Sequence, residues 1–217
     1  DSLSMRTVWT EEGGSKKVLS PVSLIVTAFA TLADVRGTLT TQLNTEEADT
    51  TLVLIDLGKG KNRMGGSILA QTLELEDSNV PDLDDSKDLI NLVNAINELR
   101  AEDQVLAYHD RSDGGLFASA CEMAFAGHVG VSLNIDTLLA ESEGIRDPVM
   151  DTGGGKTEEL RVGTLREELT LRALFNEELG ALIQVRTESR NDVMQTLRKH
   201  GLSKFSHFVG ETRPEHA

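Results

Sequence analysis

The stretch VLAYHDRSDGGLFASACEMAFAG, residues 105–127, places a short apolar run, a polar turn and an apolar helix-like segment in succession. Within the turn, the five residues 109–113 gather two carboxylates, an imidazole, a guanidinium and a hydroxyl ahead of a pair of glycines. Glycines let the backbone approach a ligand closely, and a helix that begins after them directs free N–H groups and its positive dipole end towards the turn. The pattern therefore predicts a strand, a turn able to carry a site, and a helix.

The residue types in this turn point to a metal–phosphate site. Asp110 and Asp113 offer hard oxygen ligands, which suit Mg²⁺ because this ion binds through one or two carboxylates together with substrate phosphates. The alternative is a turn whose Asp and Ser side chains only cap the following helix. The residues by themselves leave both interpretations open.

The composition is that of a folded, acidic chain. Of its 217 residues, 39% are hydrophobic and 26% are charged, and the net charge is −15. A chain this acidic lacks the basic footprint that binding to nucleic acid or to an anionic membrane requires. The single cysteine, Cys121, excludes an intrachain disulfide framework and a cysteine-rich zinc site, and no apolar run is long enough to span a membrane. We therefore predict a soluble cytoplasmic protein without nucleic-acid or membrane partners. Because the chain opens at Asp1 without a methionine, we expect it to be a piece of a longer protein.

Hydrophobic patterning predicts strands and helices that intermix along the chain. After an extended start with a turn at 11–17, we expect strands at 20–30, 51–57, 105–108, 129–135, 181–185 and 204–209, and helices at 67–75, 86–100, 116–126, 169–178 and 190–200. The helix at 86–100 carries an apolar face formed by Leu89, Leu92, Val93, Ile96 and Leu99, with Asp85 or Ser86 as its cap. Since strands and helices do not alternate strictly, a mixed sheet layered with helices, in the α+β class, is favoured over a doubly wound parallel sheet.

Other motifs give weaker signals. The glycine-rich, cationic loop at 58–66 follows a strand and precedes a helix, so its amides and cations suit a second, weaker anion site, although a turn with solvated lysines is slightly favoured. The GGGKT run at 153–157 lacks the earlier glycine and the buried strand of a phosphate-binding P-loop, and we interpret it as a surface segment. Cys121 is expected to be buried and inert, and the Glu177–Glu178 pair to be solvated. The isolated histidines His128, His200 and His207 are expected to be structural or exposed.

Four long stretches, in order along nearly the whole chain, resemble phosphoribosylformylglycinamidine synthase, the large single-chain glutamine amidotransferase of purine biosynthesis. They are DSLSMRTVW (1–9), LIDLGKGKNRMGGSILAQ (54–71), YHDRSDGGLFASACEMAFAGHVG (108–130) and ALFNEELGALIQV (173–185). In that family the synthetase region has two related halves, each resembling aminoimidazole ribonucleotide synthetase. The resemblance implies that residues 1–32 end the preceding subdomain of the second half and that residues 33–217 form its C-terminal α+β subdomain. About 30 residues, 141–170, form a surface insertion relative to the family, with a short helix around 164–172.

The resemblance also implies an activity for the parent protein. It is a carbon–nitrogen ligase that converts formylglycinamide ribonucleotide, glutamine and ATP to formylglycinamidine ribonucleotide. The first synthetase half and the glutaminase domain lie outside this chain, so they are its expected partners within a monomeric parent, and the piece alone is expected to be inactive. Cys121 does not match the context of the glutaminase nucleophile.

The resemblance further assigns roles in the turn. In the family a second nucleotide site holds ADP with magnesium and acts structurally. Asp110 matches the family's magnesium ligand and Ser112 a nucleotide contact, so Mg²⁺ and ATP or ADP are the expected cofactors, and no catalytic residue is expected. His109, Arg111 and Asp113 are secondary candidates. Two alternatives remain open: a scaffold that binds nothing and braces its neighbouring domains, and a stand-alone enzyme of the smaller aminoimidazole ribonucleotide synthetase type, which the incomplete first subdomain disfavours.

Overall fold

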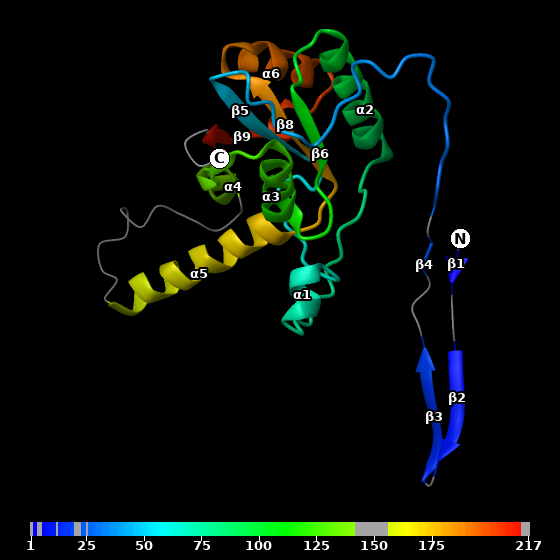
Figure 1. Cartoon of the computed structure of the whole chain (residues 1–217). Helices are drawn as coiled ribbons and strands as arrows, with labels where there is room; N and C mark the ends of the chain where they lie inside the picture. The colour runs from blue at the N-terminus through cyan, green and yellow to red at the C-terminus, as the bar shows by residue number, and fades with distance from the viewer. Residues whose placement is uncertain are drawn as a thin grey trace. The chain divides into compact units, whose positions relative to one another are not determined.

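The computed structural model describes residues 2–3, 6–11, 13–19, 23–24, 26–141 and 156–213 (Figure 1). The chain divides into two compact units, residues 1–36 and residues 37–217. Each unit is described separately below. No helix in the described ranges is both long and apolar enough to cross a membrane.

The first unit contains two antiparallel ribbons. They pair β1 (Ser2–Leu3) with β4 (Ser23–Leu24), and β2 (Arg6–Glu11) with β3 (Gly14–Leu19). The turn is therefore tighter than the predicted 11–17. The buried strand predicted at 20–30 is wrong over residues 26–30, which are irregular and exposed, Phe29 to 93%. A buried strand needs neighbouring strands and a covering layer, and the described part of this unit supplies neither.

The second unit is built on a five-stranded sheet in the order β6-β8-β5-β9-β7. Its strands are β5 (Thr50–Asp56), β6 (Ala107–Asp110), β7 (Gly130–Leu133), β8 (Gly180–Arg186) and β9 (Ser206–Arg213). Every residue of the central strand β5 is buried: the apolar run of residues 52–55 that predicted the strand, and also the polar Thr50, Thr51 and Asp56 at its ends. The α+β class is confirmed, and the sheet differs from the predicted mixed sheet in that all four of its pairings are antiparallel.

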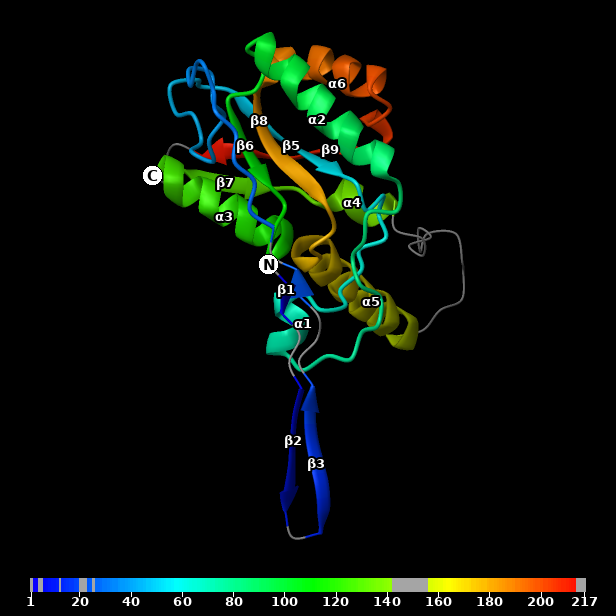
Figure 2. The same ribbon diagram turned by 90° about the vertical axis from the view of Figure 1, so that its right-hand side faces the viewer.

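Helices cover both faces of this sheet (Figures 1 and 2). The helices of this unit are α1 (Ile68–Thr72), α2 (Ser86–Ala101), α3 (Gly115–Gly127), α4 (Asp136–Glu141), α5 (Lys156–Phe175) and α6 (Arg190–Lys199), with 3₁₀ turns at η2 (Thr187–Ser189) and η3 (Ser203–Phe205); α1 lies away from the sheet. Successive residues of β5 point to opposite faces. Val53 and Ile55 pack in a cluster with α2 and α6, whereas Leu52 and Leu54 pack in a second cluster with α3.

Helix α2 agrees with its predicted ends but not fully with its predicted face. The Asp85 carboxylate accepts a hydrogen bond from the Lys87 amide at 2.9 Å and caps the helix. Leu92 and Leu99 are buried as predicted, but Leu89 and Val93 are 39% and 52% exposed. The buried stripe passes instead through Ala95, Leu92 and Leu99, since a small residue lets the helix approach the sheet.

Helix α5 replaces two predicted segments with one. It begins at Lys156, well before the predicted helices at 164–172 and 169–178, and it covers the second half of the predicted insertion. It ends at Phe175, where the side-chain Nδ2 of Asn176 donates hydrogen bonds to the carbonyl oxygens of Arg172 (2.7 Å) and Ala173 (3.3 Å) in the last turn. The remainder of the insertion, with most of the GGGKT run, lies outside the described residues. Helix α6, in contrast, ends as predicted: it is followed by Gly201, whose φ of 75° is that of a helix C-cap.

Candidate functional site

The turn that carries the candidate site leaves the edge strand β6 and enters helix α3. Strand β6 runs two residues further than predicted, so Asp110 is its last residue and pairs with Ala181 of β8. Gly114 and Gly115 both have left-handed backbones, at φ 81° and 69°. A Cβ at Gly115 would lie 2.6 Å from the Asn176 carbonyl oxygen. Glycine is therefore required here by conformation and by space.

Asp110 is exposed, and its carboxylate is held from one side. Its Oδ1 accepts a hydrogen bond from the Tyr108 hydroxyl at 2.5 Å. Burial, followed by this hydrogen bond and the charge of Asp110, raises the pKa of Tyr108 well above its ordinary value of 10.0. The phenol therefore stays protonated near neutral pH and remains a hydrogen-bond donor to the carboxylate.

His109 is tied to the protein rather than presented to solvent. Its Nδ1 lies 2.5 Å from the Asp110 carbonyl oxygen, and its Nε2 lies 2.7 Å from Glu122 Oε2 on helix α3. Both partners are acceptors, so the two bonds form together when both ring nitrogens carry a proton. The imidazole thus links the turn to the helix that follows it.

Arg111 points into the interior. Its side chain is 1% exposed, its Nε donates to the Glu178 carbonyl oxygen at 2.6 Å, and its Nη2 donates to the Leu179 carbonyl oxygen at 3.1 Å. The same Nη2 forms an ion pair with Asp56 at the end of β5. As a secondary candidate for a ligand contact Arg111 was therefore wrong, because its guanidinium is used to support the turn from inside.

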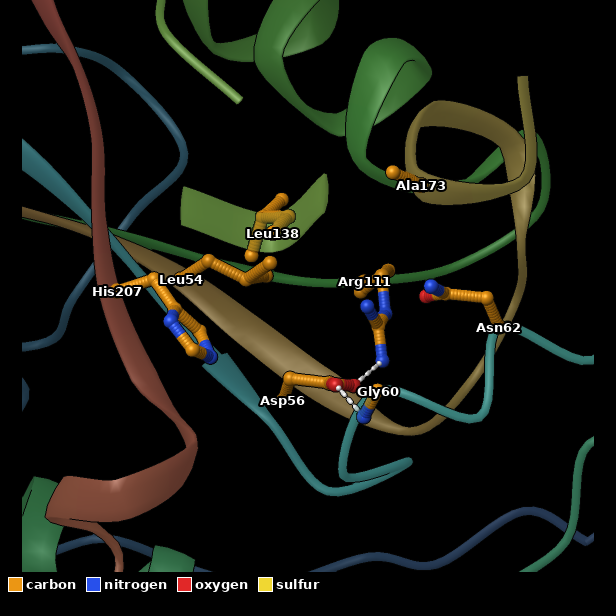
Figure 3. Close-up of a pocket in the computed structure, with 8 residues that line it drawn as sticks. All are labelled: Leu54, Asp56, Gly60, Asn62, Arg111, Leu138, Ala173 and His207. Carbon is orange, nitrogen blue, oxygen red and sulfur yellow. Dashed lines mark hydrogen bonds and ion pairs between the residues drawn. The ribbon is translucent and has the colours of Figure 1, made fainter. Parts of the chain in front are cut away.

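Asp56 joins this support to the glycine-rich loop (Figure 3). Its carboxylate accepts hydrogen bonds from the amides of Gly58 (3.1 Å) and Gly60 (2.7 Å), and Figure 3 shows Gly60 and Arg111 converging on it. A cavity of about 10 Å³ adjoins the pair, lined by Leu54, Asp56, Gly60, Asn62, Arg111, Leu138, Ala173 and His207. This space suits about one water molecule and is far too small for a nucleotide.

The cations of the glycine-rich loop are paired with carboxylates. Lys59 lies 2.7 Å from Asp88, Lys61 lies 2.9 Å from Asp84, and Arg63 lies 2.7 Å from Glu178. The prediction of a weaker anion site at 58–66 relied on these three cations. Since each of them already faces a carboxylate, the structure does not support that site, and it also shows that the lysines are not simply solvated.

The Glu177–Glu178 pair was wrongly expected to form a solvated face. Glu178 is fully buried, and its carboxylate accepts hydrogen bonds from the Arg63 amide (3.0 Å), Nε (2.7 Å) and Nη2 (2.7 Å). This carboxylate raises the pKa of Arg63 above its ordinary value. Glu177 Oε1 accepts hydrogen bonds from the amides of Gly114 (2.8 Å) and Ile68 (2.9 Å). The sequence carried only an indirect signal for these roles: two adjacent acids directly after a helix.

The remaining candidates lie where solvent can reach them. Ser112 and Asp113 are exposed, and the Ser112 carbonyl oxygen accepts a hydrogen bond from the Gly115 amide at 2.9 Å, which closes the turn. The described residues contain no group of three or more His, Cys, Asp or Glu side chains placed to hold a metal. Asp110 thus offers a single hard oxygen ligand of the kind Mg²⁺ accepts, and a metal site that includes it would need phosphates, water or other groups to complete it.

The single thiol and the three remaining imidazoles of the described residues lie outside the turn. Cys121 is half-buried, and burial, then the charge of Glu122, raises the pKa of its thiol, in keeping with the expected inert cysteine. His200 Nε2 lies 2.8 Å from Glu98 Oε2, His128 terminates helix α3, and His207 lines the small cavity. These positions agree with the expected structural roles.

A larger groove of about 570 Å³ lies between α1 and α5. Its floor is apolar, with Leu69, Leu73 and Leu171 among its lining residues, and Glu76 and Glu168 also line it. Arg172 also lines the groove but is paired with Asp77 and Glu168, so the lining keeps an excess of negative charge that repels a phosphate group, and the groove is a poor candidate for the nucleotide.

An antiparallel sheet layered with helices on both faces, with an exposed carboxylate and hydroxyl on a turn anchored from within, defines an α+β domain. Residues 49–217 match the family described as AIR synthase related protein, C-terminal domain, and residues 1–31 match the FGAR-AT PurM_N-like domain. The chain belongs to the AIR synthase related family through its C-terminal domain.

Solved structures show the same fold. Thermotoga maritima PurL complexed with AMPPCP is similar over 93% of this chain, with a TM-score of 0.54 and 14% identity. Phosphoribosylformylglycinamidine synthase II from T. maritima and T. maritima PurL complexed with ADP are each similar over 82% of it, with TM-scores of 0.52 and 16% identity. This chain covers 25%, 24% and 23% of the three, respectively, and so spans about a quarter of their length.

Proposed function

We propose that the chain is the C-terminal subdomain of the second synthetase half of a phosphoribosylformylglycinamidine synthase, preceded in residues 1–32 by the end of the neighbouring subdomain. The parent would be the ATP-dependent ligase that makes formylglycinamidine ribonucleotide in purine biosynthesis. The two family matches in sequence order and the fold of the T. maritima synthase support this proposal. The first synthetase half and the glutaminase domain are the partners it implies, in a monomeric cytoplasmic parent.

Within that parent, this piece contributes part of a structural Mg-nucleotide site and is inactive by itself. Asp110 would hold Mg²⁺ and Ser112 would contact the nucleotide. The observation that carries this assignment is the contrast between side chains within the turn. Asp110, Ser112 and Asp113 are exposed, whereas Arg111 is buried and fixes the turn from inside. A bound Mg²⁺ would neutralise phosphate charge next to the carboxylate. T. maritima PurL has been solved with AMPPCP and with ADP, which is in keeping with a nucleotide ligand.

Calorimetric titration of the chain with Mg-ADP tests the proposal. Asp110→Ala should weaken binding by at least about tenfold, as loss of groups in a metal site commonly does. Asp113→Ala is the matched control, since it removes an exposed carboxylate from the same turn, and it should have the smaller effect. Equal effects of the two variants would show that net charge, not ligation by Asp110, controls binding.

A scaffold that binds nothing is the second candidate function. It is favoured by Leu89, Ile90 and Val93, which are 39–58% exposed on helix α2 and offer an apolar surface to a neighbouring domain. Absence of Mg-ADP binding, together with absence of nucleotide in the native mass of the purified protein, would favour the scaffold.

A further inference from the structure

We propose that Glu177 is a positioning residue that holds the turn at residues 110–115 in its binding conformation. This proposal rests on the proposed Mg-nucleotide site, because it assigns a residue that prepares the site without touching the ligand. It concerns a contact between segments far apart in sequence: Glu177 lies 63 residues from Gly114 and 109 residues from Ile68.

The contact is made by one carboxylate oxygen. Oε1 of Glu177 accepts the Gly114 amide at 2.8 Å and the Ile68 amide at 2.9 Å. Gly114 is the N-cap of α3, and Ile68 is the first residue of α1, directly after the glycine-rich loop. A single charged acceptor therefore fixes the ends of two loops at once, and bonds to an ionised acceptor are stronger than bonds between neutral groups.

The turn needs this anchor for reasons of conformational entropy. The first amides of a helix have no partner within the helix, and Gly114 has no side chain with which to cap α3. Two successive glycines are the most mobile pair the backbone can contain. Without an external acceptor for the Gly114 amide, the turn would sample many other conformations.

The two ends of the turn are anchored by different residues. Arg111 holds the beginning, through its amide to the Gly180 carbonyl oxygen (2.9 Å) and through its buried guanidinium. Glu177 holds the end. Ser112 and Asp113 lie between these anchors and are exposed. The backbone that carries Ser112 is therefore fixed on both sides, and the exposed Asp110 directly precedes the first anchor.

Three variants at one position separate the possible roles of Glu177. Gln keeps an oxygen acceptor at the same place but removes the charge. Ala removes the acceptor, and Asp withdraws it by one methylene. If the residue positions the turn, Gln should preserve binding while Ala and Asp weaken it.

The experiment measures amide hydrogen exchange by NMR and Mg-ADP affinity by calorimetry, both on the full 217-residue chain. In Glu177→Ala, the Gly114 and Ile68 amides should exchange with solvent about tenfold faster, and Mg-ADP affinity should fall about tenfold, the range typical of groups that support a metal ligand. Glu177→Gln should stay within about threefold of the unsubstituted chain, both in the two exchange rates and in the Mg-ADP affinity. The charge-matched control is Glu188→Ala in η2, which should leave the exchange rates of the Gly114 and Ile68 amides unchanged.

The outcomes separate this proposal from the proposed function. Faster exchange in Glu177→Ala with unchanged Mg-ADP affinity, or a Gln variant as impaired as the Ala variant, would overturn the positioning role. Unchanged Gly114 and Ile68 amides in the Ala variant would overturn the anchor itself. Lack of Mg-ADP binding by the unsubstituted chain would overturn the proposed function, while the exchange rates of the two amides would still report whether Glu177 fixes the turn. If the Ala variant fails to fold, the Gln and Asp variants give the same comparison.

Discussion

At the scale of single residues, the candidate site depends on groups that point away from the ligand as much as on those that face it. Tyr108 shows this most directly, because its hydroxyl bonds to Oδ1 of Asp110 while its ring lies against the core. Partners of this kind orient a metal ligand and are commonly worth about 10- to 100-fold in metal affinity. The strength of the candidate metal site should therefore depend on a phenol that never touches the metal.

The ionisation of Tyr108 offers a test with no competing signal, since it is the only tyrosine in the chain. Its pKa is raised by burial and by Asp110 above the ordinary value of 10.0. The unfolded chain loses the phenolic proton near pH 10, whereas the folded chain keeps it. Stability from this group is thus complete below pH 10 and is lost as pH rises through the folded pKa.

We expect the tyrosinate absorbance to appear only above pH 10 in the folded chain and to rise together with unfolding. In Tyr108→Phe, the free energy of unfolding should fall less steeply over that range. Tyrosinate appearing at pH 10 with the fold intact would contradict the buried, hydrogen-bonded phenol.

At the scale of elements, the Arg111–Asp56 ion pair joins the turn after β6 to the loop after β5. Removing one member of a buried pair leaves an uncompensated charge and costs about 3–5 kcal/mol. Arg111→Ala should therefore lower the free energy of unfolding by about that amount. The double variant Asp56→Ala/Arg111→Ala should lose less stability than the sum of the two single variants, since it leaves no unpaired buried charge.

Denaturant unfolding measures these changes. The matched control is Arg166→Ala, which breaks an Arg–Asp pair whose side chains are 64% and 70% exposed, and such surface pairs contribute only about 0–1 kcal/mol. A double variant that is as unstable as the sum of the two single variants would show that the two groups act independently.

The same elements show what the sequence could predict. Strand β5 and helix α2 were predicted nearly to the residue because their signals are local: the apolar run LVLI for β5 and an Asp85 cap for α2. Asp110 and Ser112 could be selected by residue type and resemblance. The supporting role of Glu177 could not, because it depends on folding that brings residues 63 positions apart into contact. The strand predicted at 20–30 was wrong over residues 26–30 for a related reason, since burial is decided by neighbours and not by apolar composition.

At the scale of the whole molecule, the two units differ in how they are stabilised. Both clusters of buried apolar residues lie within residues 37–217. In the first unit, Val26, Phe29 and Leu32 are 68–93% exposed. Among the described residues, the buried apolar area that stabilises the fold therefore lies in the second unit, and its contribution is roughly in proportion to the area removed from water.

We accordingly expect residues 37–217 alone to unfold at the same denaturant midpoint as the full chain. The matched control is a further deletion, residues 45–217. It removes Leu43, which is 1% exposed and packs against Gly127, and it removes the Thr40 carbonyl oxygen that accepts the Tyr108 amide at 2.9 Å. Loss of a buried leucine of this kind costs about 2–5 kcal/mol, so this shorter chain should be clearly less stable. A midpoint that already falls on deletion of residues 1–36 would mean that the first unit contributes to the stability of the second. A midpoint unchanged in residues 45–217 would mean that the segment covering β6 is dispensable.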